Sequence, residues 1–207
     1  MKRPVLVALA AVALVSLAVL LLRGHGKGPA RPSQNLLLAR AFMSDSLGVS
    51  LRLPESTGWS LRRDPPDSSG SVVTARHEGG LATVRLFVTS ATDPDLDLAL
   101  RRRQGQVAAV FGVKDLNAII TKVIRNERGV VGGHPTLQWQ AMTDVGEAPG
   151  EAPSYVMFMW EIVVLKTRTV ECLGVVRCEA QPKDERRAVI EGLLQDVAFI
   201  LQSAQFR

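Results

Sequence analysis

The sequence predicts an α+β domain built on an antiparallel β-sheet with packed helices. Segments in which apolar and polar residues alternate come in two runs of about four, and one segment with helical spacing follows each run. Adjacent strands interrupted by only two helices are typical of antiparallel sheets, whereas parallel sheets alternate strand and helix throughout. The composition agrees with one globular domain, because 46% of the 207 residues are hydrophobic and 22% are charged.

The N-terminal segment is suited to cross a membrane. Residues 4–22 are apolar except for Ser16 and are flanked by Lys2, Arg3 and Arg23. A helix of this length covers most of a hydrocarbon core about 30 Å thick. We therefore expect residues 1–23 to form a retained signal anchor. Residues 16–18, Ser-Leu-Ala, offer a small-residue cleavage site, so a cleaved signal peptide is the alternative.

Residues 24–41 are expected to be a flexible tether, because they begin with GHGKGPARPSQN, which lacks apolar periodicity. The domain then covers residues 42–207. Basic residues on both sides of the apolar segment nearly cancel the positive-inside signal. The expected placement of the domain, on the outer side of the cytoplasmic membrane, therefore rests on the usual orientation of signal anchors. A cleaved signal would instead give a secreted domain.

The formal charge of +5 comes mostly from this N-terminal region. Residues 1–27 hold four of the 25 Lys and Arg residues and no acid, so residues 28–207 have 21 basic against 20 acidic side chains. A nearly neutral domain lacks the electrostatic footprint of a nucleic-acid-binding protein. We therefore expect the membrane as one partner, through the N-terminal helix, and no nucleic acid.

Four strands are expected at the start of the domain. Leucine or valine at positions 47, 49, 51 and 53 alternates with Ser50 and Arg52, and three further segments have strand signals. The last two are joined by Glu-Gly-Gly, which is a hairpin signal. The expected strands cover residues 47–54, 59–63, 71–77 and 81–89.

A first helix is expected after Thr92, where Asp93 can cap the helix and Pro94 can occupy its first position. Three strands follow at residues 118–127, 134–143 and 155–165, and the last of these is apolar at nearly every position, as in a central strand. Residues 169–179 form one more strand, either straight or bent at Gly174. Pro182 then opens a final helix with one apolar face.

A family resemblance rests on the order of these segments. Residues 47–54, LGVSLRLP, are followed by Trp59, a hairpin, a helix and strands that contain tryptophan, and the last helix ends in ILQSAQF. This arrangement resembles the PsbP/DcrB-like superfamily, which includes a photosystem extrinsic subunit and many exported bacterial proteins. The resemblance covers about residues 42–206. It implies an α/β/α sandwich on an antiparallel sheet and a role in binding a protein assembly, with no catalytic set.

Arg101, Arg102 and Arg103 are successive residues of the first expected helix and therefore point in different directions. Arg101 and Arg102 can face water, whereas Arg103 falls in the middle of the apolar stripe. The aliphatic stem of Arg103 is expected to cover the sheet, while its guanidinium reaches solvent or pairs with an acid. The alternative is a role for the three arginines in binding a partner.

The tryptophans differ in their surroundings. Trp139 and Trp160 alternate with apolar residues of their own strands, so we expect them in the core. Trp59 has fewer such neighbours. We expect it to be exposed or in a cleft, where it would contact a partner.

Cys172 and Cys178 leave two alternatives open. On a straight strand, six residues at about 3.3 Å each would separate them by about 20 Å, which is too far for a disulfide. If Gly174 instead turned the chain into a hairpin, an oxidising compartment would favour a disulfide between them. The alternating register of the segment favours the straight strand, with both thiols buried.

No motif for catalysis or for metal binding is present. His25, His77 and His134 belong to no known catalytic or metal-binding spacing. Residues 93, 95 and 97 are aspartates, as at the start of a calcium loop, but Leu98 and Gln104 occupy the positions that need glycine and a bidentate acid. The aspartates are better explained as stabilising a helix N-terminus. We expect no catalytic residue, no metal and no cofactor.

The sequence therefore predicts a single-pass protein of the inner, cytoplasmic membrane whose domain faces the periplasm or exterior. That domain is expected to bind another envelope protein or assembly without catalysis, with Trp59 and the three arginines as candidate contacts. Two alternatives are kept. One is a hydrolase whose site joins His77 or His134 to a distant acid. The other is a carrier of apolar ligands with a large cavity between the helices and the sheet.

Overall fold

The computed structural model describes residues 36–38, 40–56, 58–66, 70–90, 94–144, 154–179 and 184–206. The expected anchor at residues 1–23 and most of the expected tether lie outside these ranges. Within them, no helix combines the length and the apolar character needed to cross a membrane.

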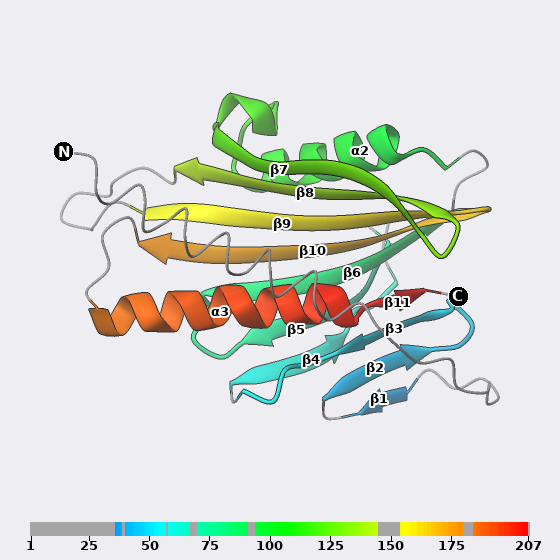
Figure 1. Cartoon of the computed structure of the whole chain (residues 1–207), viewed down its shortest axis with the longest axis horizontal. Helices are drawn as coiled ribbons and strands as arrows, with labels where there is room; N and C mark the ends of the chain where they lie inside the picture. The colour runs from blue at the N-terminus through cyan, green and yellow to red at the C-terminus, as the bar shows by residue number, and fades with distance from the viewer. Residues whose placement is uncertain are drawn as a thin grey trace.

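A seven-stranded antiparallel sheet forms the centre of the domain (Figure 1). Its strands are β4 (Trp59–Arg63), β5 (Ser71–His77), β6 (Ala82–Ser90), β7 (Ile120–Val131), β8 (His134–Asp144), β9 (Ser154–Leu165) and β10 (Arg168–Glu179). They are ordered β4-β5-β6-β10-β9-β8-β7, and every neighbouring pair is antiparallel. The predicted antiparallel sheet is confirmed. The strand predicted to be central, β9, lies inside the sheet between β10 and β8.

A second, smaller sheet was only partly predicted. It contains β1 (Leu36–Leu38), β2 (Ala41–Ser44), β3 (Val49–Arg52) and β11 (Gln205–Phe206), in the order β1-β2-β3-β11. The sequence predicted one strand in this region, and β3 is the shorter strand that forms there. β1 and the first residue of β2 fall within the expected tether. These strands escaped prediction because they are short and have too few residues to show a period.

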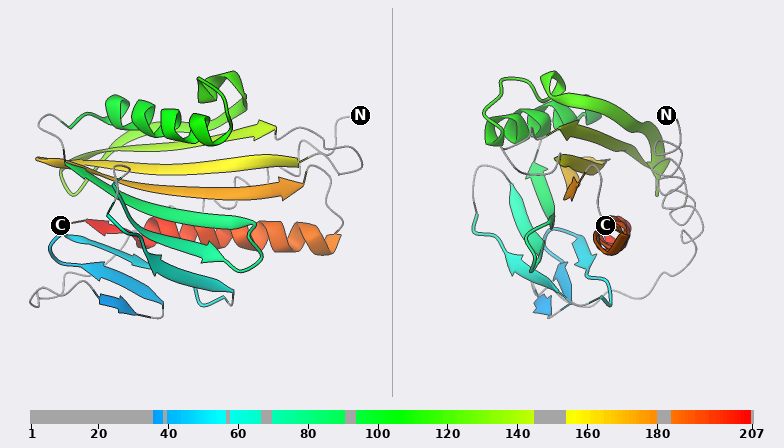
Figure 2. Two further views of the ribbon diagram at one scale, coloured as in Figure 1. Left: turned by 180° about the vertical axis from the view of Figure 1, so that it is seen from behind. Right: turned by 90° about the vertical axis from the view of Figure 1, so that its left-hand side faces the viewer.

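Two main helices cover opposite faces of the large sheet, as Figure 2 shows. The first is α2 (Leu96–Val110), which packs on β8 and β9, and the second is α3 (Asp184–Ser203), which packs on β10, β6 and β9. A short 3₁₀ helix, η1 (Leu116–Ala118), precedes β7. The predicted α+β class with two helices flanking an antiparallel sheet is therefore confirmed for the described residues.

The start of α2 differs from the prediction. Asp95 is the N-cap, and its side chain accepts a hydrogen bond of 2.8 Å from the backbone N–H of Leu98. Pro94 therefore precedes the helix rather than occupying its first position. Asp95 caps the helix because its side-chain oxygen satisfies a backbone donor that the first turn leaves unpaired.

Two hydrophobic cores lie on the two faces of the sheet. The core under α2 contains Trp139 and Trp160, which are 3% and 2% exposed, so their predicted burial is confirmed. The other core lies under α3 and joins the large sheet to the small one through residues such as Phe42 and Leu51. Alternate residues of β10 serve the two cores, because successive side chains of a strand point to opposite faces.

Gly174 allows α3 to approach β10 closely. A Cβ atom added at Gly174 would lie 2.3 Å from Cγ1 of Val197 on α3, which is closer than real side chains come. β10 is continuous through Gly174 and pairs with both neighbours there. The bend considered from the sequence is therefore wrong, and the glycine serves helix packing instead.

Candidate docking surface

Arg103 is the most buried charged residue of α2. It is 1% exposed, and its Nε donates a 2.8 Å hydrogen bond to Oε2 of Glu171 on β10, which is also fully buried. The guanidinium lies over the ring of Phe87, with its central carbon 3.4 Å from the ring centroid, and also contacts Gln106. The predicted pairing with an acid is confirmed, whereas the alternative of reaching solvent is wrong because the side chain of Arg103 is only 1% exposed.

Further polar atoms surround this ion pair. Among the described residues, Oε1 of Glu171, Nε1 of Trp160 and Oγ1 of Thr169 are buried and have no hydrogen-bond partner. These three residues lie on the face of β9 and β10 that α2 covers. Buried polar groups of this kind are commonly satisfied by internal water. The centre of the α2 interface is thus polar, inside an otherwise apolar core.

The outer side of α2 presents both charge and apolar surface. Arg101 is exposed and Arg102 is partly exposed, so the three arginines separate as the helical periodicity predicts. Two large apolar side chains, Leu98 and Val110, are 46% and 84% exposed. Arg103, by contrast, faces the sheet, so it is unable to take the partner-binding role considered for it.

β7 is the exposed edge of the large sheet. Among the described residues it pairs with β8 alone, and nine of its twelve residues are exposed. Its exposed apolar residues are Val123, Val130 and Val131, and it also carries Lys122, Arg125 and Arg128. α2 packs mainly on β8 and β9, and exposed side chains occupy both faces of β7.

Two arginines of β7 form ion pairs, and the strand keeps a net positive charge. Arg128 contacts Asp97 of α2, and Arg125 lies 2.6 Å from Glu127 on its own strand. The contact to Asp97 shows that Arg128 points to the α2 side of the sheet. The Arg128–Asp97 pair is exposed, so it contributes little stability and its charges stay accessible to solvent, whereas the Arg125 side chain is only 17% exposed.

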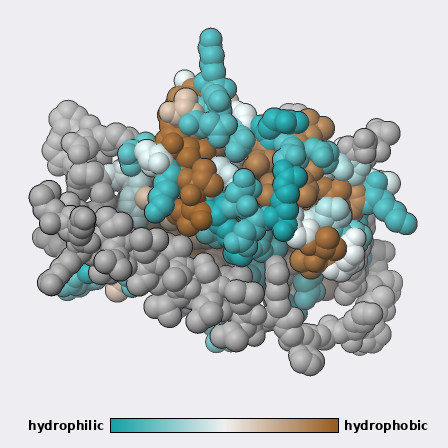
Figure 3. Space-filling model, turned by 45° about the horizontal axis from the view of Figure 1, so that its top comes forward, coloured by the Kyte–Doolittle hydropathy of each residue, from teal (hydrophilic) through white to brown (hydrophobic). Residues whose placement is uncertain are grey.

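We call the outer side of α2 together with β7 the α2–β7 surface. It consists of Leu98, Arg101, Arg102, Val110, Lys122, Val123, Arg125, Arg128, Val130 and Val131. Figure 3 brings this side of the molecule forward and shows apolar groups separated by polar ones. Such a mixture of exposed apolar and basic side chains is typical of surfaces that bind other proteins.

Formal charge is unevenly distributed over the domain. Besides the buried Arg103, residues 96–131 carry six basic and three acidic side chains. The rest of residues 28–207 carries 14 basic and 17 acidic side chains. The α2–β7 surface is therefore the basic part of a nearly neutral domain.

Trp59 is half-buried and has a structural partner. Its Nε1 donates a 2.9 Å hydrogen bond to Oδ2 of Asp196 on α3, and the same oxygen accepts a 2.7 Å bond from Ser56. The indole meets the ring of His77 edge-on, with 5.5 Å between centroids. Trp59 thus links β4 to α3, and the exposed or cleft position expected from the sequence becomes a half-buried one.

The described histidines lie at separate places. His77 ends β5 and His134 begins β8, and these strands are four positions apart in the sheet, or about 19 Å along it. Nδ1 of His77 accepts a hydrogen bond from the N–H of Gly79 in the adjoining turn. The two histidines therefore belong to no common site, and His25 lies outside the described residues.

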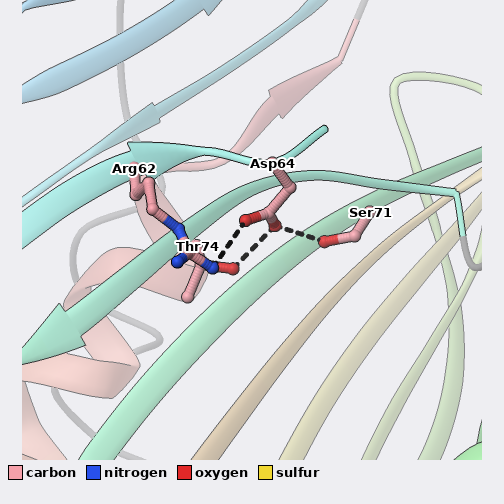
Figure 4. Close-up of polar contacts among 4 residues, drawn as sticks. All are labelled: Arg62, Asp64, Ser71 and Thr74. Carbon is pink, nitrogen blue, oxygen red and sulfur yellow. Dashed lines mark hydrogen bonds and ion pairs between the residues drawn. The ribbon is translucent and has the colours of Figure 1, made fainter. Parts of the chain in front are cut away.

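A cluster of polar residues closes the loop between β4 and β5 (Figure 4). Asp64 accepts hydrogen bonds from the hydroxyls of Ser71 and Thr74, at 2.5 and 2.7 Å, and lies 3.5 Å from Arg62. Both oxygens of the carboxylate are engaged within the hairpin. This arrangement holds the start of β5 beside the end of β4.

Both cysteines are free and buried on β10. Their strand is straight, so the disulfide alternative for Cys172 and Cys178 is wrong, and the straight-strand alternative is confirmed. Burial, with a smaller effect of Glu161, raises the pKa of Cys172 well above its ordinary value. Burial likewise raises the pKa of Cys178 to about 11, although a hydrogen bond with Tyr155 opposes the shift.

No group of three or more His, Cys, Asp or Glu residues that could hold a metal occurs among the described residues. Two of the three aspartates near the start of α2 have other partners there. Asp95 caps the helix and Asp97 contacts Arg128. Asp93 lies outside the described residues.

Sequence patterns located the arginines of this surface but missed β7 as its second half. The strand was predicted at residues 118–127, whereas β7 continues to Val131 and begins at Ile120. Its edge position depends on strand order, which alternation does not encode. The sequence does contain one local signal, because polar and charged residues occupy both faces of residues 121–128, as suits a strand exposed on both sides.

No family model matches the chain, and no curated protein is significantly similar to it. Several solved structures resemble it at low identity, among them the following three. A protein from Bacteroides thetaiotaomicron is 11% identical, with a TM-score of 0.41; the match covers 83% of this chain and 49% of that one, so this chain spans about half its length. A mutant of the protein Mog1 is 13% identical, with a TM-score of 0.43, and the match covers 77% of this chain and 90% of that one. The Ran-binding protein Mog1p of Saccharomyces cerevisiae is 9% identical over the same shares, with a TM-score of 0.39.

Proposed function

We propose that this protein is a membrane-anchored binding protein whose domain docks another protein of the cell envelope, without catalysis, through the α2–β7 surface. The observation that carries the proposal is the twelve-residue edge strand β7, which is exposed on both faces and lies beside a helix with exposed apolar and basic side chains. Long exposed edges are usually shortened or covered in isolated proteins. A partner that covers β7 explains why this edge is kept.

The anchoring part of the proposal rests on the N-terminal sequence. Residues 4–22 are long and apolar enough for a helix to reach across a bilayer, and their flanks are basic. The PsbP/DcrB-like resemblance belongs to the same proposal, because that superfamily contains many exported proteins. The domain would then face the periplasm or exterior as a single-pass protein of the inner membrane.

Placement is tested first. Cells expressing the full chain with a C-terminal tag are converted to spheroplasts and treated with external protease, and the mass of the mature chain is measured. The proposal expects a membrane-bound chain that retains residues 1–22 and loses its tag. A protected tag would place the domain in the cytoplasm, and a soluble chain without residues 1–22 would replace anchoring with secretion.

Docking is tested by site-specific crosslinking in the same cells. A photo-reactive amino acid is placed at Val110 or Val123 of the α2–β7 surface, or at Val189, an exposed valine of α3 that serves as the matched control. The proposal expects one discrete adduct from the first two sites that is absent from the third. It also expects the double change Arg101→Glu and Lys122→Glu to abolish that adduct while the protein level stays the same. Equal adducts from all three sites, or none, would contradict docking through this surface.

A further inference from the structure

We propose that the free edge of β7, over residues 125–131, is a strand-addition site for an extended acidic segment of the partner. The proposal rests on the proposed function and adds to it the mode of binding and the chemistry of the partner. In strand addition, main-chain hydrogen bonds extend the sheet by one strand, and the alternating side chains of the added segment determine specificity.

The β7–β8 hairpin shows which backbone groups of β7 are free. Its turn consists of Gly132 and Gly133, both with positive φ, as in a two-residue type I′ turn. The residues that flank such a turn, Val131 and His134, exchange both backbone hydrogen bonds, and alternate residues of the strand face opposite edges. Residues 127, 129 and 131 therefore bond toward β8, and residues 126, 128 and 130 direct their N–H and C=O groups outward.

The position of Pro135 agrees with this assignment. Pro135 lies opposite Val130 in the register between β7 and β8. A proline has no N–H to donate, so it fits only where the ladder needs no donor. Val130 therefore belongs to the outward set, as the turn geometry requires.

The two bulges of β7 lie outside residues 125–131, so this part of the edge is regular. Both register shifts lie in its first half, between Ile120 and Lys122 and between Val123 and Arg125. Bulges of this kind normally protect an edge from pairing with other chains. Beyond Arg125 the register runs without interruption to Val131, so the protection ends there. The opposite edge of the sheet, β4, has only five residues.

The basic charge of residues 96–131 favours an acidic segment as the strand that pairs with β7. Residues 96–131 carry the basic excess of the domain, and Arg128 and Lys122 are exposed. An acidic segment would be attracted here, whereas like charges placed opposite each other on neighbouring strands are destabilising. A second copy of this chain would bring the same arginines to the edge, so it is the less favoured occupant. The exposed Val131, on the other face from Arg128, calls for apolar residues between the acids.

The side chains of an added strand would follow the alternation of β7. Arg128 points to the α2 side, where it contacts Asp97, so Asn126 and Val130 point to that side as well. Glu127 and Val131 point to the other face. We therefore expect the partner segment to place its acids on the α2 side, beside Arg128, and its apolar residues on the other face, beside Val131.

The test uses synthetic peptides of about eight residues, the length of an ordinary strand. One alternates valine with glutamate, a second alternates valine with lysine, and a third is the glutamate peptide with alternate backbone amides N-methylated. Binding to the purified full chain in detergent is measured by fluorescence anisotropy. The proposal expects saturable binding of the first peptide and binding at least about tenfold weaker for the other two. Equal binding of all three, or none by the first, would overturn it.

Protein variants locate the site. Asn126→Pro removes one outward N–H without removing a bond to β8, and Asn126→Ala is the matched control that keeps the backbone donor. The proposal expects the proline variant to lose the glutamate peptide and the alanine variant to keep it. Because the proline could distort the strand, its thermal unfolding is compared with that of the alanine variant, and the N-methylated peptide makes the same test without any change in the protein. An unaltered affinity in Asn126→Pro would overturn the assignment to this edge.

The outcomes separate this inference from the proposed function. If crosslinking from Val110 persists while no peptide binds β7, the domain docks a partner by another mode, and strand addition is wrong. If β7 binds the glutamate peptide while the cells give no crosslink from either Val110 or Val123, the edge has the proposed chemistry and the envelope docking function is wrong. Self-association of the chain through β7, seen by sedimentation and lost in Asn126→Pro, would replace the acidic partner with a second copy.

Discussion

At the scale of single residues, the role of Arg103 becomes clear only once its ion-pair partner is known. Its helical position places it among apolar neighbours, and the fold supplies Glu171 from a strand 68 positions further along the chain. Each charge is fully buried, so each depends on the other. Burying a pair of charges brings a large desolvation penalty, and removing one partner leaves the other charge buried and uncompensated.

Replacing one member of this pair should therefore be severely destabilising. Arg103→Leu leaves the Glu171 carboxylate buried without its cation and is expected to lower the free energy of unfolding by about 3–5 kcal/mol. Glu171→Leu should have a similar effect. Denaturant unfolding monitored by tryptophan fluorescence measures both losses.

The double variant gives the sharper test. Because neither charge is left unpaired, Arg103→Leu combined with Glu171→Leu should lose clearly less than the sum of the single losses. Arg101→Leu is the matched control, since Arg101 is exposed on the same helix and should change stability by no more than about 0.5 kcal/mol. Strictly additive losses would show that the two residues do not stabilise each other.

At the scale of secondary-structure elements, α3 is held to both sheets. Trp59 and Ser56 bond to Asp196 near its middle, and Ser203 in its last turn accepts a 2.9 Å hydrogen bond from the N–H of Arg52 on β3. β11, which directly follows the helix, pairs with β3. Close packing on Gly174 completes the attachment, so α3 connects the large sheet to the small one.

The contact at Gly174 gives a prediction for this element. Gly174→Ala should push α3 away from β10 and lower the free energy of unfolding by about 1–3 kcal/mol, as overpacked cores do. Combining it with Val197→Ala removes the methyl that the new Cβ would meet, so the double variant should lose less than the sum of the two single changes.

A second glycine serves as the control for that experiment. Gly105 lies in α2, and an added Cβ there would meet nothing within 4 Å. Gly105→Ala should therefore raise stability by about 0.5–1 kcal/mol through helix propensity. If Gly174→Ala were equally stabilising, the close approach of α3 would be wrong.

At the scale of the whole molecule, the sheet separates two cores that α2 and α3 cover. The central strands β9 and β10 contribute to both cores, whereas β7 contributes little to either. Stability is thus concentrated at the middle of the sheet, and exposure is concentrated at one edge. This division suits a domain that offers an edge to a partner while the rest of the sheet stays intact.

The buried thiols report on this global stability. With its pKa raised to about 11, Cys178 stays protonated and covered in the folded protein at about pH 8, as does Cys172. Ellman's reagent should therefore label neither thiol rapidly until denaturant unfolds the domain, and then label both. Rapid labelling of the folded protein would contradict the close packing of β10 against α3.

The same shift predicts a loss of stability at high pH. The folded pKa of Cys178 is above its ordinary value of 9.0, so the unfolded chain releases the proton first as pH rises. This contribution to stability is fully present below pH 9.0 and is lost as pH rises toward about 11. Unfolding free energies measured across that window should fall, and they should fall less steeply in Cys178→Ala.

The sequence by itself determined most of the elements, because hydrophobic period, capping residues and glycine turns are local properties of the chain. The strands of the large sheet, both helices and the burial of Trp139 and Trp160 followed from such patterns, whereas β1, β2 and β11 are too short to show a period. The tertiary structure decided the rest: that β10 lies between β6 and β9, that Glu171 meets Arg103, that Asp196 meets Trp59, and that β7 is left at the edge. Alternation tells which side of a strand is buried, but strand order and long-range partners depend on how complete faces pack against each other. The candidate surface includes a sheet edge, and sequence patterns did not predict it because they do not encode strand order.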